Sequence, residues 1–291
     1  MAALYTGEGE ESALHLELED GYASVDELAR RAGSSQLLGL RDVGDLFARG
    51  DAALRELDTL AASATATEPF EGVRVAAPVR RPGKIVCVGL NYLAHIEESG
   101  GKKPDAIVLF AKFASSVVGD KENVVLPSIT QKLDYEGELG VVIGRRAKGV
   151  TSRDAMSFVG GFTIINDISA RDLQVAEAQW IRGKALDTFA PIGPVVVSAA
   201  SAPAIEDMRI LTKVNGDVRQ DASCSWMITS VPDLISHISE AITLEPGDII
   251  ATGTPSGVGL GMTPQVYLQP GDVVSVEING IGVLTNTVVA G

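Results

Sequence analysis

Hydrophobic and polar residues alternate near the start of the chain in a way that is typical of a half-buried strand. Leucines at positions 14, 16 and 18 are separated by polar residues, and the segment ends at the turn sequence Asp20–Gly21. Ser24 and Glu27 match a capping box, which predicts a helix over residues 26–31. Two more helices are predicted over residues 42–49, ended by Gly50, and over residues 51–61.

The segment AASATATEPFEG, residues 61–72, is small and polar and contains Pro69, as linkers often do. It predicts a small α+β N-terminal domain over residues 1–72 and a larger domain over residues 73–291. In the larger domain, short apolar runs predict strands over 84–90, 138–144, 161–167, 194–198, 248–253, 272–278 and 281–288. Helices are predicted only over 92–98, 151–157 and 232–242. Strands that do not alternate regularly with helices favour an α+β, β-rich core over a doubly wound sheet.

Composition and charge narrow the class of protein. Two cysteines among 291 residues exclude a disulfide scaffold, a cysteine-rich zinc site and an iron–sulfur cluster. The net charge of −14 argues against nucleic acid or an anionic membrane as a partner. Residues 1–75 carry −9 of this charge, so the larger domain is close enough to neutral to bind an anionic substrate. No apolar run approaches the ~18 residues of a membrane helix, and residues 1–12 lack a signal-peptide pattern. We therefore expect a cytoplasmic protein.

Two glutamates in the segment LDYEGELGVVIG, residues 133–144, suggest a metal site. Glu136 and Glu138 are two positions apart, which places both on one face of a strand. Two neighbouring carboxylates repel each other unless a cation lies between them, and hard divalent cations prefer such oxygen ligands. The alternative is an exposed edge strand with two solvated glutamates. Asp167, directly after the predicted strand FTIIN, could supply a third carboxylate. Such a set favours Mg²⁺, Mn²⁺ or Ca²⁺ over Zn²⁺.

Two further segments carry candidate catalytic groups. Lys184 lies in a Gly- and Pro-rich segment over residues 180–194, where it could balance the carboxylates or be a solvated loop lysine. His95 and Glu98 share a face of the predicted helix over 92–98, because they are three positions apart. A carboxylate that orients an imidazole makes a better general base, although surface His–Glu pairs without a function are common.

A glycine-rich segment, TGTPSGVGLG over residues 252–261, follows a predicted strand. It lacks the Gly-Lys-[Ser/Thr] end of a nucleotide-binding loop, and Met262 occupies the position where a dinucleotide-binding loop would need its last glycine. Backbone N–H groups and Thr254 in this loop fit a pocket for a carboxylate better than one for a nucleotide.

These motifs together, in this order, resemble the fumarylacetoacetate hydrolase family. LDYEGELGVVIG, NDISARDLQ, RGKALDTFAPIGP and TGTPSGVG carry the resemblance, which runs from about Lys84 to the C-terminus. It implies a mixed β-roll or barrel-like fold, a homodimer, and a small, variable N-terminal domain. The GLNY form of the first motif looks most like members described as ureidoglycolate lyases or diketo-deoxy sugar acid hydrolases. Leu90 stands where many members have Arg, so we expect this protein to recognise a distal carboxylate of the substrate differently from those members.

The resemblance also assigns roles to residues. Glu136, Glu138 and Asp167 match the family's ligands for Mg²⁺ or Mn²⁺, and Lys184 matches its active-site lysine. His95 and Glu98 match the dyad of short hydrolase and decarboxylase members such as acylpyruvases. Gln174 matches a substrate-contacting glutamine, and Thr254 lies in the loop that meets the carboxylate end of the substrate. The predicted set of substrate contacts is Arg171, Gln174, Thr188, Gly253 and Thr254.

The function implied is hydrolysis of a C–C bond in a β-diketo acid through a metal-stabilised enolate. His95, oriented by Glu98, would activate water, and Lys184 would stabilise the enolate. Because enolates also serve other reactions, oxaloacetate-type β-decarboxylation and ureidoglycolate-type lyase or isomerase chemistry are the alternatives. The remaining alternative is a non-catalytic metal- or ligand-binding protein, but such a function does not explain why all these groups occur together.

Overall fold

The computed structural model describes residues 2–6, 13–18, 20–67 and 75–291. Its N-terminal part has three strands, β1 (Ala2–Thr6), β2 (Ala13–Leu18) and β3 (Gly21–Ser24), followed by three helices, α1 (Val25–Ala32), α2 (Val43–Arg49) and α3 (Asp51–Ala61). The Ser24 hydroxyl accepts a hydrogen bond from the Glu27 N–H at the start of α1. The predicted hairpin, capping box and three helices are therefore confirmed.

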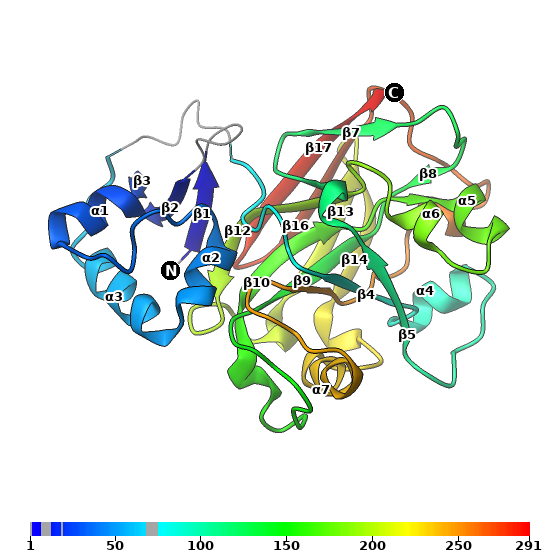
Figure 1. Ribbon diagram of the computed structural model, residues 1–291. Coiled ribbons are helices and arrows are strands. Elements are labelled where there is room, and N and C mark those ends of the chain that lie inside the picture. Colours follow the sequence, from blue (N-terminus) through cyan, green and yellow to red (C-terminus); the bar gives the residue numbers. More distant parts are fainter. Residues whose placement is uncertain (1, 7–12, 19, 68–74) are drawn as a thin grey trace.

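The N-terminal strands extend the main sheet of the larger part of the chain (Figure 1). β1 pairs antiparallel with β12 (Ala190–Ser198), so that Ala2 lies opposite Val197. The main sheet has ten strands in the order β3-β2-β1-β12-β10-β9-β15-β4-β5, and β6 (Val117–Val118) pairs with β12 off this path. The domain boundary predicted near residue 72 lies outside the described residues.

The centre of the main sheet consists of β10 (Val159–Asn166), β9 (Gly137–Ile143), β15 (Ile249–Ala251), β4 (Ile85–Gly89) and β5 (Val108–Lys112). β9 and β10 are antiparallel, while β15 and β4 are parallel. Every residue of β9 is buried, because both faces of this strand are covered. The alternative interpretation, an exposed edge strand with two solvated glutamates, is therefore wrong.

A second sheet covers one face of β9. It contains β14 (Asp217–Ser223), β13 (Arg209–Val214), β16 (Val273–Ile278), β17 (Gly282–Ala290) and β7 (Asn123–Leu126) in that order. Sequence analysis missed the hairpin of β13 and β14, whose turn is Asn215–Gly216 with φ of 53° and 87°. An Asn–Gly pair is a strong hairpin signal, because both residues tolerate positive φ.

The remaining elements are short. β8 (Leu133–Asp134) pairs with β11 (Ser169–Ala170), and the helices are α4 (Leu93–Glu98), α5 (Arg171–Ala176), α6 (Ile181–Lys184) and α7 (Val231–Ala241). The helix predicted over 151–157 is instead a turn followed by a 3₁₀ turn at Ala155–Phe158. Here the Thr151 hydroxyl donates to Asp154, a side-chain bond that competes with a regular helix.

Two of the three hydrophobic cores among the described residues hold these layers together. One lies between the main sheet, the second sheet and α7, and includes Leu139, Ile164 and Ile238. The other lies between the main sheet and the N-terminal helices, where Phe47 packs directly over Gly160. The result is the β-rich α+β fold with a curled sheet that the resemblance implied. No helix in the described ranges is long and apolar enough to cross a membrane.

Gly137 sets how closely the two sheets can approach beside the glutamates. A Cβ at this position would clash with Thr212 Oγ1 and would lie 2.9 Å from Val276 Cγ1, on the face opposite the glutamate side chains. We predict that Gly137→Ala lowers the free energy of unfolding of the metal-free protein by about 1–3 kcal/mol, because the added methyl group overpacks this contact.

Denaturant unfolding of the purified variant measures this loss. Gly101→Ala is the matched control, since its Cβ would meet no atom of the described residues closer than 3.4 Å, and its stability should change by less than about 0.5 kcal/mol. Equal stability of Gly137→Ala and the wild type would contradict the proposed close contact between the sheets.

Candidate active site

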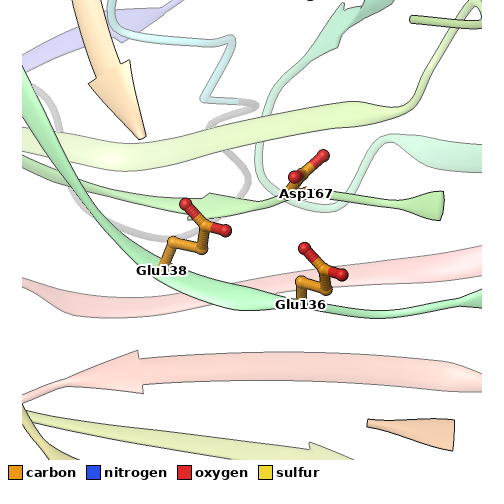
Figure 2. A group of neighbouring side chains, drawn as sticks. All are labelled: Glu136, Glu138 and Asp167. Carbon is orange, nitrogen blue, oxygen red and sulfur yellow. The ribbon is translucent and has the colours of Figure 1, made fainter. Parts of the chain in front are cut away.

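Three buried carboxylates meet at the centre of the main sheet. Glu136 directly precedes β9, Glu138 is its second residue, and Asp167 directly follows β10. The Asp167 N–H donates to the Glu136 carbonyl at 2.8 Å, which holds the two segments side by side. One carboxylate oxygen from each residue lies within 4.8 Å of the others, and Figure 2 shows the three side chains converging. The sequence prediction that these acids come together is confirmed in geometry.

Two buried lysines offset part of the negative charge of this cluster. Lys184 Nζ lies 2.7 Å from Glu136 Oε2 and 2.7 Å from Asp167 Oδ2. It is the last residue of α6 and is 1% exposed, so it is not a solvated loop lysine. Lys112 Nζ lies 2.8 Å from Asp167 Oδ1 and also donates to three backbone carbonyls, those of Ile168, Lys184 and Phe189. Sequence analysis missed Lys112; its signal is a single lysine at the end of an apolar strand.

The three carboxylates differ in how well their charge is compensated. Burial alone would raise the pKa of Glu136, but the Lys184 ammonium and the Arg171 guanidinium hold it well below its usual range. Burial raises the pKa of Glu138 well above its usual range, and the charges of Asp167 and Glu136 add to this. Glu138 accepts a hydrogen bond from the Gly253 N–H at 2.8 Å. Glu138 is thus the carboxylate that would gain most from an added cation.

The donor set fits a hard divalent cation. It consists of carboxylate oxygens from three buried residues, and such ligands suit Mg²⁺, Mn²⁺ or Ca²⁺ better than Zn²⁺. A divalent charge would also relieve the repulsion that acts on Glu138. The triad could therefore hold a metal ion.

Arg171, the first residue of α5, links the carboxylates to the substrate side of the site. Its Nη1 lies 2.6 Å from Glu136 Oε1 and donates to Gln174 Oε1 at 3.1 Å, and its Nε donates to Asp134 Oδ2 at 2.8 Å. Its Nη2 is buried and has no hydrogen-bond partner in the part of the chain that the structure describes. A buried, unpaired guanidinium N–H is suited to receive a ligand carboxylate.

His95 and Glu98 form the predicted pair on α4. His95 Nδ1 and Glu98 Oε1 are 2.8 Å apart, and Glu98 Oε2 accepts the Gly257 N–H at 2.7 Å. An ionised carboxylate only accepts hydrogen bonds, so this pairing with Glu98 places the shared proton on Nδ1 and leaves Nε2 outside the pair.

Several of these groups line a cavity of about 180 Å³. Its polar lining comprises His95, Ser99, Glu136, Glu138, Arg171, Gln174, Lys184 and Thr254. Its apolar wall includes Leu90, Phe110 and Trp180, and the rings of Phe110 and Trp180 meet edge to face with centroids 5.4 Å apart. Leu90 adopts a positive φ of 60°. It contributes an apolar side chain at the position where many members of the family that the motifs resemble have Arg.

The remaining predicted substrate contacts are placed differently. Thr254 lines the cavity, but its hydroxyl donates to the Gly137 carbonyl and accepts from Gln220 Nε2. Gly253 supports Glu138 through its N–H, with a φ of 99° that favours glycine. Thr188 lies outside the cavity lining, and its hydroxyl accepts the Val125 N–H at 2.9 Å. Sequence analysis also missed Phe110, Trp180 and Gln220 as parts of the site.

Residues 84–289 match the sequence model of the family described as fumarylacetoacetate (FAA) hydrolase, C-terminal. Because the match covers well over half of the chain, the protein belongs to this family of enzymes, as the motifs indicated. Among its relatives, the oxaloacetate tautomerase YisK of Bacillus subtilis (strain 168) is 46% identical over 220 residues, which are 74% of this chain and 73% of that protein. The mitochondrial oxaloacetate tautomerase FAHD2A of Homo sapiens is 43% identical over 243 residues, 83% of this chain and 77% of that protein.

Solved structures of similar proteins have the same fold. The fumarylacetoacetate hydrolase from psychrophilic Exiguobacterium antarcticum is 37% identical, with a TM-score of 0.85 and coverage of 100% of both chains. The 5-carboxymethyl-2-hydroxymuconate delta-isomerase from Mycobacterium smegmatis is 32% identical, with a TM-score of 0.77 and coverage of 100% of this chain and 99% of that one. The names of these relatives cover tautomerase, hydrolase and isomerase activities.

Glu138→Gln tests the metal site without changing the shape of the side chain. We predict that it weakens Mn²⁺ binding by more than about tenfold, since even residues that merely support metal ligands contribute this much. The metal-free variant should be at least as stable as the metal-free wild type, because one of three repelling carboxylates is removed.

Equilibrium dialysis and thermal unfolding with and without Mn²⁺ measure both effects. Wild-type protein should gain thermal stability from the ion through mass action, and the variant should not. Glu97→Gln is the control, because Glu97 is an exposed glutamate on α4. Unchanged Mn²⁺ affinity in Glu138→Gln would remove Glu138 from the ligand set.

Proposed function

We propose that this protein is a divalent-metal-dependent enzyme that interconverts the enol and keto forms of a small 2-oxo dicarboxylate, with oxaloacetate as the first candidate. Two relatives that share 43–46% of their aligned residues with this chain are named oxaloacetate tautomerases. The observation that carries the proposal is that the His95 imidazole, the Arg171 guanidinium and two carboxylates of the triad, Glu136 and Glu138, line one small cavity.

The charges around the cavity favour an anionic substrate once a cation is bound. The described residues place four buried carboxylates and three buried cations there, namely Asp134, Glu136, Glu138 and Asp167 with Lys112, Arg171 and Lys184. Glu98 beside His95 adds a further carboxylate, and a divalent ion would offset the excess of negative charge. The ion and the Arg171 guanidinium could then attract a carboxylate of the substrate.

Glu136, Glu138 and Asp167 would hold the ion, for which we propose Mg²⁺ or Mn²⁺. When bound, such an ion supplies Lewis acidity that polarises the carbonyl of a 2-oxo acid and stabilises negative charge on its oxygen. Arg171 Nη2 would receive a carboxylate of the substrate, with Gln174 beside it. The buried Lys184 ammonium, which lies next to Glu136 and Asp167, would add positive charge near the enolate oxygen.

His95 would move the proton. Glu98 would keep the imidazole oriented with Nδ1 protonated, so Nε2 could take a proton from C3 of the keto acid and deliver it to the oxygen on C2, and carry out the reverse transfer from the enol. Tautomerisation needs no water and no leaving group, which fits a cavity of about 180 Å³. Cavities that hold drug-sized ligands measure roughly 300–1,000 Å³.

A second candidate is hydrolysis of a C–C bond in a β-diketo acid. The same His95–Glu98 pair could activate a water molecule instead, and a structural neighbour at a TM-score of 0.85 is named a fumarylacetoacetate hydrolase. Oxaloacetate-type β-decarboxylation would use the same enolate. These reactions share the binding apparatus and differ in the bond that breaks, so product analysis separates them.

We further propose that the enzyme works as a homodimer in the cytoplasm. Exposed apolar side chains near the site, such as Phe113 and Val175, support an interface, and both cysteines are free thiols, as a reducing compartment allows. Light scattering that returns the mass of a single chain would contradict the dimer.

The deciding experiment follows the ultraviolet absorbance of enol-oxaloacetate with metal-stripped protein, Mn²⁺ alone, and both together. We expect the protein with Mn²⁺ to accelerate loss of the enol, with oxaloacetate recovered quantitatively in an assay with malate dehydrogenase. Pyruvate formed in step with enol loss would instead establish decarboxylation. Acetylpyruvate tested in parallel would yield pyruvate and acetate if the enzyme is a hydrolase.

His95→Gln removes the proposed base and leaves the carboxylate triad intact. We predict that kcat falls by about 10²-fold or more, in line with what a general base contributes, while Mn²⁺ affinity is retained. Glu97→Gln, one helical position away from the pair, serves as the control and should keep full activity. Undiminished turnover by His95→Gln would exclude the dyad from the reaction.

A further inference from the structure

Asp134 is a wholly buried carboxylate to which the reaction outlined above gives no role. Its side chain is 0% exposed and accepts four N–H groups. Oδ2 accepts from Arg171 Nε at 2.8 Å and from the Leu260 N–H at 3.0 Å, while Oδ1 accepts from the Gly259 N–H at 2.7 Å and from the Tyr135 N–H at 3.0 Å. Asp134 therefore joins α5 to the loop over residues 257–261.

The same loop holds the carboxylate of the dyad. The Gly257 N–H donates to Glu98 Oε2 at 2.7 Å, and the Gly257 carbonyl accepts the Tyr135 hydroxyl at 2.8 Å. Gly261 packs against Glu98 so closely that an added Cβ would lie 2.5 Å from Glu98 Cδ. The position of Glu98, and through it the ring of His95, depends on where this loop lies.

Three consecutive residues thus connect the loop to the metal site. Asp134 and Tyr135 bind the loop, and Glu136 belongs to the carboxylate triad. Arg171 provides a second connection, because it pairs with both Asp134 and Glu136. The dyad and the triad, which come from distant parts of the chain, are fixed relative to each other through these contacts.

We propose that Asp134 is a positioning residue that sets the Glu98–His95 pair at the correct place relative to the metal ligands. The kinetic part of this inference rests on the proposed function. The four groups around Asp134 are all N–H donors, so an ionised carboxylate satisfies them all. An asparagine would turn an NH₂ group toward one pair of donors and leave those donors unsatisfied.

Asp134→Asn is the direct test. We expect kcat to fall by about tenfold or more, part of the about 10²–10⁴-fold that general-base catalysis supplies, with Mn²⁺ binding retained. In a Glu98→Gln background the same substitution should have little further effect, because both changes act on one imidazole. Losses that simply multiply in the double variant would overturn the proposal.

A second readout does not depend on turnover. The chain has three histidines, so the ring nitrogen signals of His95 can be assigned by comparison with His95→Gln. Wild-type protein should show a single tautomer with the proton on Nδ1, and Asp134→Asn should show a mixture of tautomers. An unchanged single tautomer in Asp134→Asn would refute the positioning role even if the wild type proved inactive on every substrate tried.

Two further variants separate positioning from folding. Gly261→Ala places a methyl group against Glu98, and we expect it to cause the same loss of kcat and the same tautomer mixture. It tests the positioning role even if Asp134→Asn does not fold. Asp248→Asn is the matched control, since Asp248 is 1% exposed and accepts the Lys84 and Glu245 N–H groups at the other end of β15. It should lower thermal stability and leave kcat and the His95 signals unchanged.

Discussion

The burial of three carboxylates within 4.8 Å of one another is the constraint around which the site is organised. Like charges at this separation repel strongly in an environment without water, and removal from water adds a further cost. Lys184 and Lys112 offset the charges of Glu136 and Asp167, while Glu138 relies on a backbone N–H. The incomplete compensation at Glu138 is the physical reason why the cluster suits a divalent cation.

Beside the carboxylates, the two sheets pack so closely that only a small residue fits between them. Glu136 and Glu138 direct their side chains to the cavity, so the residue between them faces the second sheet, and Gly137 leaves room there for Thr212 and Val276. Gln220 of that second sheet accepts the Gly137 N–H and donates to the Thr254 hydroxyl. Packing between the sheets therefore also fixes the loop beside the triad, which ties the stability of the fold to the geometry of the site.

The cavity combines a polar half, which suits the 2-oxo acid end of a substrate, with an apolar wall. Leu90, Phe110 and Trp180 form that wall, and under the proposed function the polar contacts for a second carboxylate would come from Arg171 and Gln174. Under the proposed function, such a site would stabilise an enolate, and the space beyond the enolate would decide whether a proton, a carboxylate or an acyl group leaves. This explains how relatives with the same fold can carry tautomerase, hydrolase and isomerase names.

The sequence by itself determined the features that depend on local periodicity. The placement of Glu136 and Glu138 on one strand face, Asp167 after a strand, the His95–Glu98 pair and the Ser24 cap all follow from residue spacing and local hydrogen bonding. Only the tertiary structure decided the contacts between distant segments. Asp134 accepts the Gly259 N–H across 125 residues and Glu98 accepts the Gly257 N–H across 159. The tertiary structure also brings Lys112 and Trp180 to the site and leaves Thr188 outside the cavity lining. The reason is the same in each case, because strand pairing and sheet packing set which side chains meet. Spacing along the chain does not encode these contacts.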